Sequence, residues 1–122
     1  MPIRTTLAIL ATAMLAACAT KPPEKPGSHL VVRDLSGKLL MQFDYPTDDL
    51  CARTSTSMRS MKMYKAGCDR ASAAAPLHGQ ATLRYNPPGV LVRAHYADLA
   101  ACRQQTAQLA TGVELILDCA AK

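Results

Sequence analysis

Three methionines cluster at positions 58, 61 and 63, and a fourth, Met41, precedes them in a predicted strand. Thioether sulfur is a soft ligand that selects Cu(I). Met58 and Met61 are also spaced to share one helical face with Leu50, and methionine commonly fills irregular gaps in small cores. We therefore predict that Met58 and Met61 are buried packing residues and that no metal or other cofactor is bound. Binding of Cu(I) or Ag(I) by Met58, Met61 and Met63 is the alternative.

Basic side chains are unevenly distributed along this chain, which has 14 Lys and Arg against 9 Asp and Glu. A candidate face for an anionic partner consists of Arg53, Arg59, Lys62, Lys65 and Arg70. The alternative is an ordinary solvated helix surface. Nucleic acid is not a predicted partner, because the chain has no Trp and no basic run interleaved with aromatic residues.

Catalytic residues are not predicted. The chain contains no G-x-S-x-G, S-x-x-K or H-E-x-x-H motif and no phosphate-binding glycine loop. Its three histidines, His29, His78 and His95, are scattered singly along the sequence. A cysteine protease needs a free thiol, and a four-cysteine zinc site favours paired C-x-x-C spacing, which this chain lacks. We expect a protein that is not an enzyme.

The first 18 residues have the pattern of an export signal. Arg4 precedes an apolar run over residues 7–17 that only Thr12 interrupts, and the run leads directly into Cys18. Such a run is shorter than the roughly 20 residues that a membrane-spanning helix needs, but it has the length of a secretory signal. Its last residues, Leu15-Ala16-Ala17-Cys18, resemble the lipobox of bacterial lipoproteins. An ordinary secretory signal or a short buried helix is the alternative.

The resemblance implies that residues 1–17 are a signal peptide and that Cys18 becomes an acylated N-terminus. More than one acyl chain gives stable membrane anchoring. Ala19 stands where an aspartate retains many lipoproteins in the inner membrane, so the resemblance implies the outer membrane, facing the periplasm, with the cell surface as a variant. Removal of Arg4 with the signal lowers the formal net charge from +5 to +4.

A proline-rich stretch separates this signal from the rest of the chain. Residues 18–28 include Pro22, Pro23 and Pro26, and proline stiffens a chain into an extended spacer. We predict a tether over residues 18–28, with an ordered arm packed on the domain as the alternative. Residues 29–122 are then one small domain with a thin core.

Four further cysteines form two pairs with 17 positions between partners: Cys51 and Cys68, and Cys102 and Cys119. A shift of the sequence by 51 positions superposes both pairs and also aligns Leu40 with Leu91 and Tyr45 with Tyr96. This self-similarity predicts a duplication, with one copy over residues 29–69 and the other over residues 80–120.

Each half of the domain is predicted to contain two strands, a helix and a further strand. In the first half, strands over 29–34 and 39–45 precede a helix N-capped by Thr47 and a weak strand over 62–66. In the second half, strands over 80–85 and 90–96 precede a helix that begins at Asp98 and ends at Gly112, followed by a strand over 113–117. The predicted fold class is α+β, with two tandem ββαβ-like repeats whose helices pack on an antiparallel or mixed sheet.

This order of elements explains the cysteine spacing. About ten helical residues rise roughly 15 Å, and about five strand residues return roughly 16 Å. The second cysteine of each half therefore comes back to the first, within disulfide range. We predict the disulfides Cys51–Cys68 and Cys102–Cys119, as expected for an oxidising compartment.

Three classes of function fit these features. The leading hypothesis is a non-enzymatic lipoprotein that binds an envelope protein or an anionic envelope component, or supports an envelope assembly. The second is an inhibitor of a periplasmic or host hydrolase, and the third is metal handling through the methionines. The sequence does not identify the partner or the oligomeric state.

Overall fold

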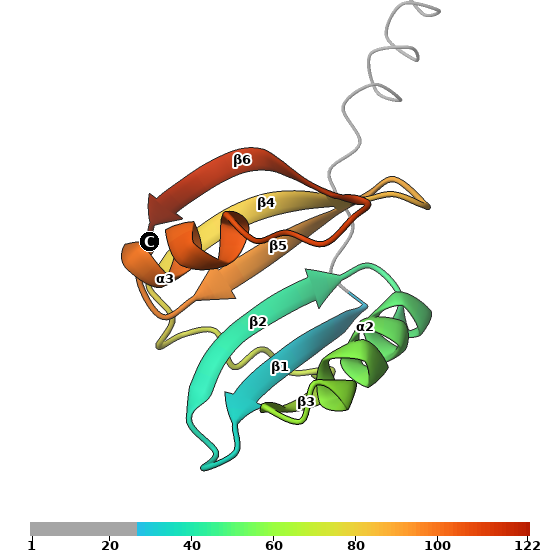
Figure 1. Ribbon diagram of the computed structural model, residues 1–122, viewed down its shortest axis with the longest axis vertical. Coiled ribbons are helices and arrows are strands. Elements are labelled where there is room, and N and C mark those ends of the chain that lie inside the picture. The colour runs from blue at the N-terminus through green and yellow to red at the C-terminus, as the bar shows by residue number, and fades with distance from the viewer. Residues whose placement is uncertain (1–26) are drawn as a thin grey trace, which may run out of the picture.

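The computed structural model describes residues 27–122 and shows an α+β fold in which one antiparallel sheet carries two helices (Figure 1). The elements are β1 (Ser28–Asp34), β2 (Leu39–Tyr45), α2 (Asp48–Ser60), β3 (Tyr64–Asp69), β4 (Gly79–Tyr85), β5 (Val90–Tyr96), α3 (Leu99–Thr106) and β6 (Val113–Ala121). The predicted signal peptide and Cys18 lie outside the described residues. Ser28, predicted as the end of the tether, is instead the first residue of β1.

The six strands have the order β3-β1-β2-β5-β4-β6, and every pair of neighbours is antiparallel. The sheet therefore contains three strands from the first half of the chain and three from the second. These two groups meet where β2 pairs with β5, with Phe43 opposite Ala94. The predicted α+β class is confirmed, and of the two sheet types considered, the antiparallel one is present.

Both helices cover the same face of the sheet and leave the other face free of helix. α2 packs on the strands of the first half and α3 on those of the second (Figure 1). The strands alternate accordingly: Leu30, Val32, Phe43, Leu83 and Val92 are buried beneath the helices. Tyr45 and Tyr96, which the shift of 51 positions aligns, are buried in the same core.

Side-chain caps begin both helices at the predicted residues. Thr47 Oγ1 accepts a hydrogen bond from the Leu50 N–H at 3.3 Å, and Asp98 Oδ1 accepts one from the Ala101 N–H at 2.8 Å. Each cap satisfies an amide that has no partner within its helix. Among the described residues, no helix is long and apolar enough to cross a membrane.

The bounds of several elements differ from the prediction, and β3 and β6 extend to Asp69 and Ala121 rather than ending at positions 66 and 117. α3 ends at Thr106 rather than near Gly112, because the chain after it must turn so that Val113 pairs with Tyr85 of β4. β3 begins at Tyr64 rather than at position 62, because Lys62 adopts a left-handed conformation with φ 60° that reverses the chain after α2.

Both predicted disulfides are present. Cys51 is bonded to Cys68 and Cys102 to Cys119, with Cα–Cα distances of 6.1 and 5.9 Å. Each bond joins a helix to the last strand of the same half, α2 to β3 and α3 to β6. The two edge strands of the sheet, β3 and β6, are therefore each held covalently to a helix.

Candidate functional site

A groove of about 400 Å³ lies between the two helices, above the centre of the sheet. Its floor consists of apolar and aromatic side chains from the central strands, among them Met41, Phe43 and Tyr96. Its walls come from α2 and from α3 with the loop that follows, including Met58 and Leu109. The groove exists because neither short helix extends over the line where β2 meets β5.

The rim of the groove is polar and carries one charged residue. Thr54 and Ser57 of α2 face Gln105 and Gln108 on the other side, and Arg53 is the only charged residue in the lining. Arg53 Nη2 donates to Asp49 Oδ2 at 2.8 Å on the exposed surface of α2. An apolar floor with a few polar groups at the rim is the usual chemistry of a binding cleft.

Two tyrosines support one part of the groove, which Tyr85 lines while Tyr45 lies in the core behind it. Tyr45 Oη donates to Tyr85 Oη at 2.9 Å, and their rings meet edge to face with centroids 5.4 Å apart. Burial raises the pKa of both phenols, so both stay protonated under ordinary conditions. The pair gives the apolar floor a neutral hydrogen-bonded support.

The predicted methionines do not share one environment. Met58 packs against the core, as predicted, but it is half-buried rather than buried. Met61 is 56% exposed because it is the C-cap of α2, so the prediction that it is buried was wrong. Met41, Met58 and Met61 all line the groove, whereas Met63 is 58% exposed and lies outside its lining.

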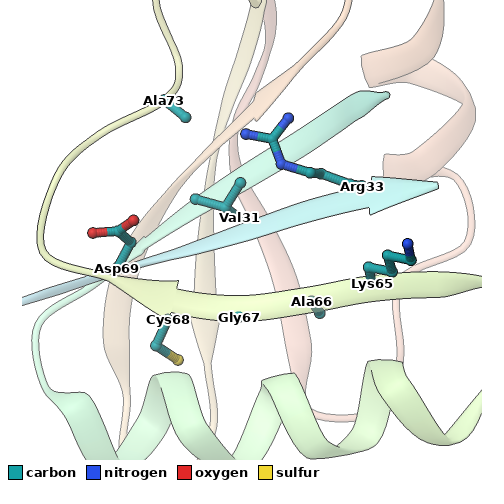
Figure 2. Close-up of a pocket in the computed structure, with 8 residues that line it drawn as sticks. All are labelled: Val31, Arg33, Lys65, Ala66, Gly67, Cys68, Asp69 and Ala73. Atoms are coloured by element: carbon teal, nitrogen blue, oxygen red, sulfur yellow. The ribbon is translucent and has the colours of Figure 1, made fainter. Parts of the chain in front are cut away.

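The predicted basic face is divided among different surfaces. Arg53 lines the groove on the helix side. Lys65 points from β3 away from α2, into a hollow on the opposite face of the sheet (Figure 2). The other three residues are exposed. Arg59 lies at the end of α2, Lys62 follows that helix, and Arg70 lies in the linker between the two halves. The structure therefore does not bring the five residues together on one face.

A buried polar cluster on the helix-free face was missed by sequence reasoning. His29 Nδ1 and His95 Nε2 each lie 2.7 Å from one oxygen of Asp44, so two histidines described as isolated in sequence bind the same carboxylate. Gln42 is fully buried, and its Nε2 donates to Asp44 Oδ1 at 2.8 Å and to Ser72 Oγ at 3.0 Å. The signal that could have revealed the cluster is strand alternation, which places Gln42 and Asp44 on the same face of β2.

Lys122 completes this cluster and determines the tautomer of His95. Lys122 Nζ lies 2.7 Å from His95 Nδ1, and an ammonium group can only donate. His95 Nδ1 therefore accepts, and Nε2 carries the hydrogen that is donated to Asp44. Burial opposes the charge on Asp44, but hydrogen bonds from His95, His29 and Gln42 hold the pKa of that carboxyl well below its usual range.

The cluster fastens the linker, residues 70–78, to the sheet. Gln42 Oε1 accepts from the Ala73 N–H at 2.7 Å, and Lys122 Nζ donates to the Ala74 carbonyl at 3.3 Å. Among residues 27–122, no buried side-chain nitrogen or oxygen lacks a hydrogen-bond partner. The cluster thus satisfies its own polar groups while it holds the linker over the open face.

The described part of the chain contains no group of three or more His, Cys, Asp or Glu residues that could hold a metal ion. We found no match for this chain among protein-family models, curated proteins or solved structures.

Proposed function

We propose that this chain is an outer-membrane-anchored lipoprotein that acts without catalysis as a binding or assembly module of the cell envelope. The groove between α2 and α3 carries the proposal, because it offers an apolar and aromatic floor with polar side chains at its rim. The lipobox resemblance over residues 1–18 supports the proposed location at the outer membrane. The two disulfides are typical of an oxidising compartment.

The partner in this proposal is an envelope protein that inserts an apolar side chain between the helices and carries acidic residues beside it. The groove lining contains one cation, Arg53, and no carboxylate, and the proposed mature chain, without Arg4, has a formal net charge of +4. An acidic segment is therefore attracted to the rim, while its apolar anchor gains free energy from burial on the floor.

The duplication is part of the proposal, since it explains why the groove lies at the centre. A shift of 51 positions places the bounds of β1 on those of β4, and the bounds of β2 on those of β5. Two copies joined edge to edge through β2 and β5 leave one helix on each side of the junction. The groove is then the space between two equivalent helices.

A photo-crosslinking residue tests the groove in intact cells. We expect adducts with an envelope protein from Ser57 and Gln108, which line the groove. The matched controls are Thr56 of α2 and Gln104 of α3, which are exposed but do not line the groove, whereas Gln108 lies in the loop after α3. Equal yields of crosslinked protein from the groove and control positions would contradict the proposal. Crosslinks to lipid alone would indicate that the groove binds an acyl chain and not a protein.

A palmitate analogue tests the anchor separately. We expect label on the wild-type protein and none on Cys18→Ser, because acylation in lipoproteins takes place at the lipobox cysteine. Equal labelling of both proteins removes the anchor from the proposal but leaves the groove untouched.

A second candidate function is Cu(I) binding, which is favoured by the presence of Met41, Met58 and Met61 in one groove. Thioethers are the ligands that Cu(I) selects. Competition against a chromogenic Cu(I) chelator tests it with Met58→Leu/Met61→Leu, which keeps a similar volume in the groove. If the wild type competes with the chelator for Cu(I) and this variant does not, Cu(I) binding becomes the leading functional hypothesis.

A further inference from the structure

A second hollow lies on the helix-free face, between β1, β3 and the linker (Figure 2). Its volume is about 320 Å³. Arg33 and Lys65 stand at one end, Asp69 at the other, and Val31 and Ala73 form apolar walls between them. This hollow and the groove between the helices are on opposite sides of the sheet, so they are separate sites.

Two cations meet at one end of the hollow. The antiparallel register places Arg33 directly opposite Lys65, and Figure 2 shows both side chains on the face away from α2. Like charges directly opposite each other on neighbouring strands are destabilising. Among the ion pairs of residues 27–122, none includes Arg33 or Lys65. A negatively charged ligand would relieve this repulsion.

The nearest carboxylate in sequence is committed elsewhere. Asp34 Oδ1 accepts hydrogen bonds from Ser36 Oγ at 2.6 Å and from the Ser36 and Lys38 amides at 2.9 Å. Arg33 itself donates to the carbonyl of Gly37 at 3.3 Å through Nη1. Its guanidinium has five N–H donors, so it keeps donors for a ligand.

The hollow has room for that ligand. Gly67 lies on β3 between Lys65 and Asp69, and a Cβ placed on it would meet no atom within 4 Å. The absent side chain leaves the floor open beside the two cations. Asp69 repels negative charge at the far end, so an anion is directed to the end with Arg33 and Lys65.

We propose that Arg33 and Lys65 bind a phosphate group in the hollow between β1, β3 and the linker. A guanidinium offers two parallel N–H donors to a tetrahedral oxyanion, and the ammonium of Lys65 adds a third. Two opposed cations also match the double charge of a phosphate monoester better than the single charge of a carboxylate. The site does not depend on the proposed groove function.

Titration with inorganic phosphate, followed by NMR on the full oxidised chain in non-ionic detergent, tests the site. We expect saturable shifts of the Val31, Gly67 and Ala73 amides. Arg33→Gln/Lys65→Gln should weaken binding by about tenfold or more. The control Arg59→Gln/Lys62→Gln removes the same charge from exposed positions and should bind as the wild type.

A steric variant separates a built site from general attraction. Gly67→Leu keeps both cations and fills the open space, so it should abolish the shifts at Val31 and Ala73. Both variants are compared only if far-UV circular dichroism and both disulfides match the wild type. Binding by Gly67→Leu that equals the wild type, or equal weakening by the two charge variants, overturns the proposal. Shifts that never saturate indicate an adventitious ion only and also overturn it.

Vesicle binding identifies the source of the phosphate. The full chain with Cys18→Ser is mixed with phosphatidylcholine vesicles that either contain or lack phosphatidic acid, whose headgroup is a phosphate monoester. Binding that needs phosphatidic acid, Arg33 and Lys65 assigns the site to a lipid headgroup. Binding of phenyl phosphate with no dependence on phosphatidic acid assigns it to a soluble monoester.

Discussion

Asp44 is a carboxylate kept in the protein interior by the groups that surround it. Its side chain is 14% exposed and accepts from His29, Gln42 and His95. Charge-assisted hydrogen bonds of this kind are roughly twice as strong as neutral ones. The free energy of folding therefore depends on Asp44 more than on any of the exposed acidic residues.

Replacement of this carboxylate should destabilise the fold. We expect Asp44→Asn to lower the free energy of unfolding by about 2–3 kcal/mol. The side-chain amide of asparagine has only one acceptor oxygen, so it cannot replace the two carboxylate oxygens that bind the two histidines. Urea denaturation at pH 7 measures the change. Asp48→Asn, an exposed change in the first turn of α2, should cost about 0.5 kcal/mol, and an equal cost for the two variants would contradict the role given to Asp44.

The depressed pKa of Asp44 also predicts how stability changes in acid. Because the folded-state pKa lies below the unfolded value of about 4, the contribution of Asp44 is complete above about pH 4 and is lost as pH falls through the folded pKa. Urea midpoints measured from pH 7 down to about pH 2 should therefore converge for the wild type and Asp44→Asn. Curves that stay parallel in acid would argue against the low pKa.

Gly112 holds a turn that no other residue adopts without strain. Its φ is +86°, and an added Cβ would lie 2.6 Å from the carbonyl oxygen of Asn86. Gly112→Ala should cost about 1–3 kcal/mol. Gly67→Ala provides the contrast, because its Cβ would enter open space. In thermal unfolding, Gly112→Ala should therefore lower the melting temperature more than Gly67→Ala does.

The residues at the polar cluster show why part of this structure was not predictable from the sequence. Side-chain alternation along β2 places Gln42 and Asp44 on one face, and this could be predicted from the sequence. The strand order was not readable, and only that order brings His29 of β1 and His95 of β5 to either side of Asp44. Long-range strand pairing leaves no local pattern, so the two histidines looked isolated.

At the scale of elements, α2 shows how one residue at a helix end changes the interpretation of a pattern. Helical spacing alone places Met58 and Met61 on one stripe. The helix ends at Ser60, however, and the chain reverses at Lys62. Met58 therefore contributes to the core, while Met61 remains mostly in solvent at the rim of the groove.

This difference predicts unequal costs for truncation. Met58→Ala should lower the free energy of unfolding by about 1–2 kcal/mol, less than for a fully buried methionine, because the side chain is only half-buried. Met61→Ala should change it by about 0.5 kcal/mol or less. Chemical denaturation of both variants measures these costs. Equal losses of stability would contradict the prediction and show that Met58 and Met61 are equally packed.

Each disulfide should stabilise its own half of the sheet. We expect Cys102→Ala/Cys119→Ala to cost about 3 kcal/mol in the chain-entropy model. Hydrogen exchange should become faster in β6 and α3 but much less so in β1 and β3, because Cys51–Cys68 still holds the other edge. Faster exchange spread evenly over the sheet would contradict this division.

Cysteine spacing was the most informative feature at this scale. Equal intervals of 17 positions predicted both disulfides, and the order of helix and returning strand explained them. The end of α3 was not predictable in the same way. Residues 107–112 have to form the turn at which the Asn86 amide donates to the Gly112 carbonyl at 2.7 Å, and this tertiary requirement overrides local helix propensity.

At the scale of the whole molecule, the halves meet along one pair of strands. The β2–β5 register contains four residue pairs, from Met41–Tyr96 to Asp44–Arg93. The β1–β2 and β4–β5 registers contain six and seven. Both disulfides lie within a half, so no covalent bond between side chains of residues 27–122 crosses this junction. The groove lies above the junction and the pinned linker lies on the opposite face.

The junction between β2 and β5 consequently has a mechanical meaning. Under tension that draws the two halves apart, the sheet should part first at its shortest strand pairing, while each half stays closed by its own sulfur–sulfur bond. The linker would then act as a strap of fixed length that limits how far the halves separate. Force on a partner in the proposed groove would load this joint, and we expect the β2–β5 pairing to part before either half unravels.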